Sequence, residues 1–516
     1  MFLKTRVLRT AVAALAITLL CFVSSGHCQS GAVVSYSEAE QLILGQVAAG
    51  KVADFGNLPP EKRSIPADFL AQLLTGKLAG ASVSNEGVLI DHAIVQGRLG
   101  VAGAEIRYSV WLNDCDFRGP VDFSRAYLHG DLSAANSQFH GDADFDGLRA
   151  EGNIVFQSAS FLGLFDISGS QIHGNLNVAG AVFADQAGNA AQFDNVTGLV
   201  RADLENITLK VPLTLDGAES QILCLGGACD SPDGSSPRPS PDKLLIVKQV
   251  NLSHATVHRE LHLERMQIET LLATSLKVEG LADFENLKII TKADLSHSQL
   301  FDLVLTDDIT WPSSEQSLEL GGISFQYISP ESHSGASSSQ DSKADPQWTN
   351  LVTWADKSNY ATAPYQPLED ALRREGRTEL ADEVFENKEK KARSSAGLGW
   401  QAEVKNFMLY VLVGYGREPQ RAFYWSALVV LFGWLVAFRN REDVEPRDIK
   451  DEHKPYDPFW YSLDLFLPIA TLEAADVWMP RQSSRARRYY AGVHAVLGWI
   501  LIPIGLAAIT GLESGK

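Results

Sequence analysis

Glycine recurs at every eleventh residue through the first half of the chain, at Gly119, Gly130, Gly141, Gly152, Gly163 and Gly174. Mostly apolar residues lie two positions before each glycine and again two and four positions after it, as at Phe139, Ala143 and Phe145. A repeat of fixed length cannot bury its apolar face alone, so successive units must stack. Because alternation at steps of two is typical of strands with one inward face, the repeat predicts a parallel β-helix.

The same spacing extends the predicted solenoid over about residues 85–310. After an interruption it returns, with a one-residue slip, at Ile246, Val257, Ile268, Val278 and Ile289. The interruption contains a Pro-, Ser- and Gly-rich stretch, which predicts an inserted loop near residues 224–243.

The N-terminus has the pattern of a secretory signal peptide over residues 1–27. Lys4, Arg6 and Arg9 precede an apolar stretch, and small residues follow it. Cleavage is expected near Ser25 to Cys28, with an uncleaved anchor as the alternative. The pattern predicts an exported protein.

Two short helices are expected between the signal and the solenoid. Ser37 and Glu40 have the spacing of a capping box, and a second helix is predicted from Pro66 to the residues before Gly76. Because the open end of a solenoid core must be covered, residues 33–80 are predicted to form a helical cap.

Export permits disulfide bonds. Cys224 and Cys229 flank two glycines in the segment CLGGAC, and the predicted pairing is a disulfide between them, with two reduced cysteines as the alternative. Cys115 lies at a core position of the repeat and is expected to be buried packing rather than a nucleophile.

The formal net charge of −19 argues against nucleic-acid binding, which needs a basic face. The chain has no Walker loop, nucleophile elbow or dinucleotide fingerprint after a strand. We therefore expect no cofactor and no catalytic residues, and a non-enzymatic role is favoured.

Two residue clusters leave a metal site and an enzymatic site open as alternatives. His254, His258 and His262 are four residues apart, so on one strand they are about 13 Å from one another, too far for one metal ion unless neighbouring coils supply partners. Asp142, Asp144 and Asp146 could form the outer carboxylate cluster of a polysaccharide-active enzyme, although acidic turns explain them equally well.

The C-terminal third predicts helices and a membrane anchor. Residues 332–347 have the composition of a flexible linker, and 350–395 have the spacing of a helical hairpin. Residues 400–516 are predicted to form a membrane module with spans at about 422–438 and 490–512. The fold class is therefore mainly β, a parallel β-helix with an N-terminal helical cap, a C-terminal helical hairpin and a two-span transmembrane module.

Between the spans, Asp464, Glu473 and Asp476 lie in an otherwise apolar segment. Carboxylates facing lipid are costly, which indicates an interfacial or re-entrant loop. Lys and Arg are concentrated between Arg439 and Arg488, and the positive-inside rule places this connection in the cytoplasm. The solenoid is then periplasmic.

Four segments carry a family resemblance: VGYGREPQRAFYW at 413–425, YSLDLFLP at 461–468, the pair Trp478 and Pro480, and GWILIPIGLAAITGL at 498–512. With them, the chain resembles bacterial membrane proteins that join a pentapeptide-repeat-like β-helix to a two-span, ion-channel-like module. The resemblance implies an inner-membrane location. Some relatives carry the label membrane-associated oxidoreductase, which no cofactor motif here supports.

The favoured function is a membrane-anchored periplasmic scaffold for envelope interaction or sensing. Its expected partners are the lipid bilayer and an envelope protein or glycan, and the membrane module could form a homo-oligomer. The alternative is an ion-conducting or mechanosensitive channel with Asp464, Glu473 or Asp476 in its pore. An exported polysaccharide-active enzyme is the third hypothesis.

Overall fold

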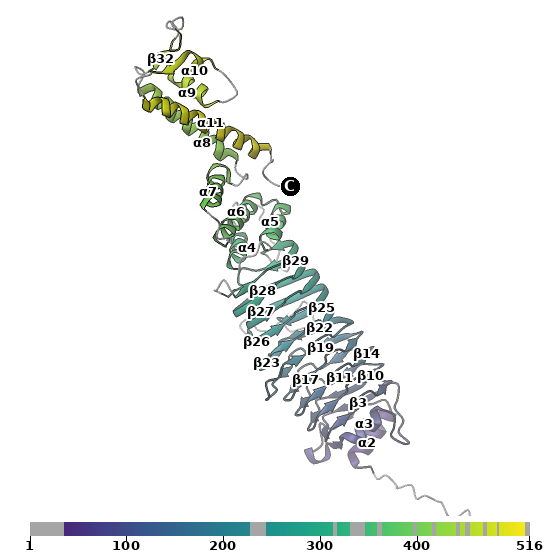
Figure 1. The fold of residues 1–516 in the computed structure, drawn as a ribbon. Helices are drawn as coiled ribbons and strands as arrows, with labels where there is room; N and C mark the ends of the chain where they lie inside the picture. Colours follow the sequence, from purple (N-terminus) through teal and green to yellow (C-terminus); the bar gives the residue numbers. More distant parts are fainter. Residues whose placement is uncertain are drawn as a thin grey trace, which may run out of the picture. The chain divides into compact units, whose positions relative to one another are not determined.

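The computed structural model describes residues 36–227, 244–312, 317–330, 346–358, 364–395, 400–414, 419–439, 444–448, 455–467, 472–481 and 485–510. The chain divides into two compact units, residues 1–211 and 212–516. Parallel β-solenoid strands occupy both units, so the predicted fold class is confirmed (Figure 1). The predicted signal peptide and Cys229 lie outside the described residues, as do residues 332–345 of the predicted linker.

In the first unit, one coil of the solenoid contains two of the eleven-residue repeats. Tyr127 pairs with Arg149 on the next coil, and 149 − 127 = 22 residues. A coil therefore has four short sides, such as β9 (Val121–Asp122), β10 (Tyr127–Leu128), β11 (Leu132–Ser133) and β12 (Gln138–Phe139).

The other strands of this unit stack on the same four sides. With β11 lie β3 (Val88–Asp91), β7 (Val110–Asn113), β15 (Ile154–Val155), β19 (Asn175–Asn177) and β22 (Leu199–Glu205), and β1 (Ala53–Asp54) pairs with β3. With β9 lie β5 (Leu99–Gly100), β13 (Ala143–Asp144), β17 (Phe165–Asp166) and β21 (Ala191–Gln192). With β10 lie β6 (Glu105–Ile106), β14 (Arg149–Ala150) and β18 (Gln171–Ile172). With β12 lie β2 (Ser64–Pro66), β4 (Ile94–Gln96), β8 (Asp116–Phe117), β16 (Ser160–Phe161), β20 (Val182–Phe183) and β23 (Thr208–Leu209).

The core of this unit is a column of aromatic rings. Phe117, Phe139, Phe161 and Phe183 occupy equivalent positions on successive coils, and their ring centroids are 4.7, 4.7 and 5.2 Å apart. All four side chains are buried. Offset stacking adds to the hydrophobic stabilisation that burial of the rings provides.

The periodic glycines are needed where coils approach closely. A Cβ at Gly119 would lie 2.3 Å from the carbonyl oxygen of Gly97, and one at Gly141 would lie 2.7 Å from the nitrogen of Pro120. The left-handed corners of the coil lie elsewhere, for example at Arg125 and Asn136. Backbone packing between coils therefore excludes a side chain at these periodic glycines.

The N-terminal helices lie at one end of the first unit. Helix α2 (Glu38–Ala48) begins after Ser37, and the predicted capping box with Glu40 is present. Helix α3 (Ala67–Leu74) follows the short 3-10 helix η1 (Pro60–Lys62) and buries Phe69, Leu70, Leu73 and Leu74.

The second unit has longer strands. These strands are β24 (Leu213–Thr214), β25 (Glu219–Gly226), β26 (Leu245–Asn251), β27 (Thr256–Leu272), β28 (Lys277–Asp294), β29 (Gln299–Leu305), β30 (Leu318–Glu319) and β31 (Ser324–Ser329). Two of them continue through left-handed corners, at Arg265 in β27 and Asn286 in β28. Val257 pairs with Val278, a separation of 278 − 257 = 21 residues, which accounts for the one-residue slip in the repeat.

Three helices follow the last coil where a two-helix hairpin was predicted: α4 (Pro346–Lys357), α5 (Tyr365–Arg374) and α6 (Thr378–Ser395). The Trp354 ring of α4 contacts the rings of Trp311 and Phe325 in the solenoid. The Arg374 guanidinium of α5 lies over the Tyr327 ring. The additional helix α4 was missed because its apolar positions immediately follow the polar linker composition.

The remaining elements are α7 (Trp400–Val413), α8 (Pro419–Arg439), β32 (Val444–Pro446), α9 (Pro458–Phe466), α10 (Ala474–Val477), β33 (Trp478–Pro480) and α11 (Arg485–Thr510). Among the described residues, two helices are long and apolar enough to cross a membrane, with candidate spans at Gln420–Ala437 and Arg485–Ala507. Only 22% and 17% of these windows are buried within the molecule, unlike the core helices of a soluble domain.

Candidate functional site

A charged cluster lies on the outer face of β27. Leu261 and Leu263 point into the core and are fully buried, so Glu260, His262 and Glu264 alternate with them on the other face. The neighbouring strand β28 places Asp283 directly beside His262 in the parallel register. Three carboxylates thus surround one imidazole.

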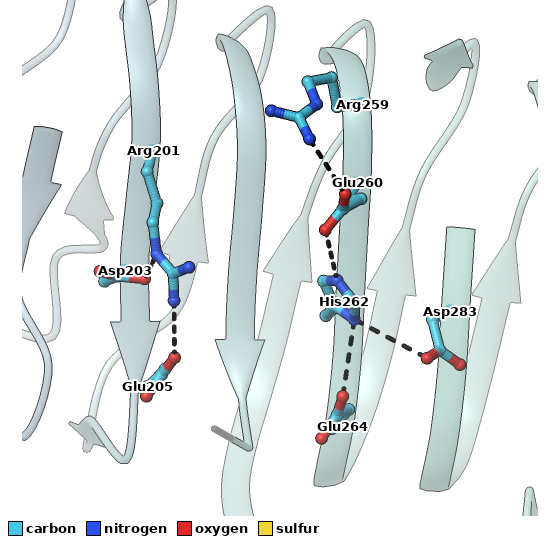
Figure 2. Close-up of polar contacts among 8 residues, drawn as sticks. All are labelled: Arg201, Asp203, Glu205, Arg259, Glu260, His262, Glu264 and Asp283. Atoms are coloured by element: carbon cyan, nitrogen blue, oxygen red, sulfur yellow. Dashed lines mark hydrogen bonds and ion pairs between the residues drawn. The ribbon is translucent and has the colours of Figure 1, made fainter. Parts of the chain in front are cut away.

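The two ring nitrogens of His262 face different carboxylates (Figure 2). Nδ1 lies 3.6 Å from Glu264 Oε1 and 3.7 Å from Asp283 Oδ2, whereas Nε2 lies 3.5 Å from Glu260 Oε2. The side chains of His262, Glu264 and Asp283 are only 15%, 13% and 10% exposed. We call His262, Glu264 and Asp283 the β27–β28 cluster.

Electrostatics in this cluster oppose the effect of burial. Burial alone would lower the pKa of His262, but the Asp283 and Glu264 carboxylates raise that pKa to about 10. Burial, reinforced by the charges of Glu264 and Asp283, raises the pKa of the nearby Glu285 carboxyl. The surrounding carboxylates therefore stabilise the protonated form of His262.

A cluster in the first unit shows how such carboxylates are otherwise satisfied. Arg201 Nε lies 2.5 Å from Asp203 Oδ1, and Arg201 Nη2 lies 3.2 Å from Glu205 Oε1 (Figure 2). These are direct charge-assisted hydrogen bonds. The separations between His262 and its carboxylates, 3.5, 3.6 and 3.7 Å, are longer than these.

The other two histidines of the predicted series do not join His262. His254 pairs with Asp216 at 2.9 Å and is exposed. His258 lies between Glu219 and Glu279, at 2.9 and 2.8 Å. All three histidines lie on the outside of the coil but have separate partners, and a neighbouring coil supplies Asp283 as a partner to His262, the condition that the sequence left open.

The aspartates of the polysaccharide-enzyme hypothesis act in the turns. Asp142 Oδ1 accepts a hydrogen bond from the Leu164 amide on the next coil, and Asp144 Oδ1 accepts one from the Asp146 amide. Burial raises the pKa of Asp144, as do the neighbouring aspartates on its face. A bond between coils thus accounts for Asp142, and a local turn accounts for Asp144.

A groove of about 320 Å³ runs over one outer face of the first unit. Trp111 lies in it and is 42% exposed. Its other lining residues are mostly polar: Asn113, Asp131, Ser133, Asn153, Val155, Asn175, Asn177 and Asp203. Asp131 Oδ1 accepts hydrogen bonds from Asn153, and Asn153 Oδ1 accepts one from the Asn175 amide, so a hydrogen-bonded polar row crosses successive coils.

The three carboxylates proposed for a pore have different surroundings. Asp464 is buried, and its two oxygens accept hydrogen bonds from the amides of Leu472 (2.7 Å) and Ala475 (2.6 Å). Glu473 and Asp476 are exposed. Asp464 thus holds the segment after α9 against α9.

Sequence reasoning missed a buried polar network among helices α8, α9 and α11. His494 of α11 is 2% exposed, and a ring nitrogen lies 3.0 Å from the Ser462 carbonyl of α9. The Ser462 hydroxyl donates to the Val430 carbonyl of α8, and the Tyr490 hydroxyl lies 3.3 Å from His494 Nδ1. The sequence did contain one signal for this network, namely a histidine, His494, inside an apolar candidate span. Ionisable residues in such spans rarely face lipid, so His494 could be expected to have polar partners within the protein.

Cys115 and Cys224 are structural residues. Cys115 is free and buried, as expected, and burial raises the pKa of its thiol to about 12. Cys224 is disulfide-bonded. Since Cys229 lies outside the described residues, the specific Cys224–Cys229 pairing stays a prediction.

Comparison with known proteins identifies the repeat. Residues 102–149 match the family model for pentapeptide repeats (9 copies). The chain therefore contains a pentapeptide-repeat β-helix. No curated protein and no solved structure matches it.

Proposed function

We propose that this protein is a membrane-anchored periplasmic scaffold whose solenoid binds an envelope glycan. The observation that carries the anchoring is the exposed apolar surface of α8 and α11. Phe423, Leu431 and Leu435 of α8 are more than half exposed, as are Val493 and Trp499 of α11. Such a surface in a monomer favours a lipid or protein environment.

The polar network supports the same assignment. Ser462 and His494 are satisfied within the helices, so the outward surface consists mainly of apolar side chains. In lipid, polar groups must find partners inside the protein, and this arrangement meets that requirement.

The groove around Trp111 supports a glycan as the partner. An exposed indole provides an apolar face for a sugar ring, and the amides and carboxylates beside it provide donors and acceptors for hydroxyl groups. Because coils repeat about every 4.8 Å, the groove presents polar groups at regular intervals to an extended polymer.

Anchoring and orientation are tested in bacterial spheroplasts with the full chain. We expect the protein to stay in membranes after an alkaline carbonate wash and to be released by detergent. A cysteine at Lys77 should react with an impermeant thiol reagent, whereas one at Asp448 should react only after permeabilisation. Release by carbonate, or the reverse labelling pattern, would contradict the proposal.

Glycan binding is tested by cosedimentation of the detergent-solubilised full chain with insoluble cell-wall glycan. Trp111→Ala should weaken binding about tenfold or more, as expected for a central aromatic contact. Phe301→Ala removes an aromatic side chain of similar exposure on the other unit and serves as the matched control. Equal binding by both variants and the unmodified protein would rule out the groove.

A further inference from the structure

We infer that the β27–β28 cluster is a binding site for one divalent transition-metal ion of the Zn²⁺ class. This inference does not depend on the proposed scaffold function. It rests on three ligand atoms, His262 Nδ1 and one oxygen each from Glu264 and Asp283, which all lie within 4.8 Å of one another.

The separations fit a shared ion better than direct contacts. The distances from His262 Nδ1 to Glu264 Oε1 and Asp283 Oδ2, 3.6 and 3.7 Å, are too long for good hydrogen bonds. Ligands placed about 2.0–2.2 Å from a tetrahedral ion lie roughly 3.4 Å from one another, close to these values.

Unsatisfied buried atoms provide an independent observation. His262 Nδ1 and Asp283 Oδ1 are both buried and have no hydrogen-bond partner in the part of the chain that the structure describes. The Asp283 side chain is nine-tenths buried. Burying polar atoms without partners is costly, and an ion coordinated by His262 Nδ1 and the Asp283 carboxylate would lower that cost.

The opposite side of the imidazole has the arrangement expected behind a metal ligand. His262 Nε2 faces Glu260 Oε2 at 3.5 Å, and Arg259 lies 3.6 Å from the other oxygen of Glu260 (Figure 2). Metal-bound histidines commonly donate their second ring N–H to a carboxylate, which fixes the tautomer that coordinates. A small shift of Glu260 on metal binding would bring it within hydrogen-bond distance of Nε2, so we assign Glu260 as a positioning residue and Nδ1 as the coordinating atom.

The ligand set indicates the class of ion. An imidazole nitrogen with two carboxylates suits Zn²⁺ and similar transition ions, whereas Ca²⁺ and Mg²⁺ prefer all-oxygen sites. Three protein ligands leave a fourth coordination position for water or another ligand.

The test is a titration of the detergent-solubilised full chain, stripped with chelator, against ZnCl₂, MnCl₂ and CaCl₂ by competition with a chromophoric chelator. We expect Zn²⁺ to bind most tightly, with His262→Gln and Asp283→Asn each weakening its affinity more than about 100-fold. Glu260→Gln should cost about 10–100-fold, the range for residues that orient a ligand.

His254→Gln is the matched control, because it removes an exposed histidine that pairs with one carboxylate, Asp216. Its Zn²⁺ affinity should equal that of the unmodified protein. Circular dichroism of each variant establishes that it is folded, and Glu264→Gln provides a second ligand variant if Asp283→Asn does not fold. The inference is overturned if folded unmodified protein binds no Zn²⁺, or if His262→Gln binds it with unchanged affinity.

Discussion

The Phe139 ring stacks on the Phe117 ring with centroids 4.7 Å apart and planes only 9° from parallel. On its other side Phe139 stacks equally closely on Phe161. One residue therefore joins three successive coils of the core, and its removal leaves a cavity between them.

Phe139→Ala should lower the free energy of unfolding of the solenoid by about 3–5 kcal/mol, the usual cost of truncating a buried aromatic ring. Urea denaturation followed by circular dichroism measures this. Phe139→Leu retains more volume and should cost clearly less. Equal losses for the two variants would argue against a packing origin.

Gly141→Ala should destabilise the solenoid by about 1–3 kcal/mol, because the added methyl group meets the backbone of the preceding coil. Gly100→Ala is the matched control, since a Cβ at Gly100 meets nothing within 4 Å. Thermal denaturation should show a lower midpoint for the first variant only. A similar decrease in both would indicate a general requirement for glycine flexibility.

His258 should contribute stability that decreases as pH rises. Its hydrogen bonds with Glu279 and Glu219 raise its pKa, and Glu279 also pairs with Lys277. A group whose pKa is higher in the folded than in the unfolded protein contributes its full stabilisation at pH values below the unfolded pKa, here about 6.5. That contribution is lost as the pH rises through the pKa of the folded protein. The stability difference between unmodified protein and His258→Gln should therefore be larger at about pH 5.5 than at about pH 9. A difference that grows with pH would contradict this sign.

Asp464→Asn should loosen the segment after α9. The two carboxylate oxygens of Asp464 each accept a hydrogen bond, one from the Leu472 amide and one from the Ala475 amide, whereas an asparagine side chain has a single acceptor oxygen. Hydrogen exchange at those two amides should become faster. Glu473→Gln and Asp476→Asn, which change exposed groups, should leave exchange unchanged. If Asp464→Asn instead altered ion conduction without affecting exchange, a role in a pore would be favoured.

Gly498→Ala should disrupt the packing of α11 against α9. A Cβ at Gly498 would lie 1.8 Å from the Phe466 carbonyl oxygen, a distance that requires the helices to separate. Gly492→Ala, in the same helix, meets nothing within 4 Å. The thermal midpoint in detergent should decrease for the first variant and stay within a few degrees for the second.

The repeat was sufficient to predict the fold but not the size of its coil. An eleven-residue period is compatible with one or two repeats per coil, and the choice depends on corner geometry at residues such as Asn136. The Ser37 capping box could be predicted because it depends on neighbouring residues alone.

The β27–β28 cluster depends on contacts that a single strand does not contain. His262 and Asp283 are 283 − 262 = 21 residues apart and meet because one full coil of the solenoid separates them. Similarly, His494 and Ser462 meet through helix packing, which apolar composition does not specify. Residue types were visible in both cases, whereas their pairing required the fold.

The coil length has a mechanical consequence. In the first unit, hydrogen bonds between coils run along the solenoid axis, so tension applied along that axis loads them one coil at a time. A coil of 22 residues occupies about 4.8 Å of axis when folded, yet its extended chain spans about 75 Å. Each coil that detached would lengthen the chain by many times the height of the folded coil. Under tension the solenoid would therefore extend in discrete steps and dissipate mechanical energy at each one.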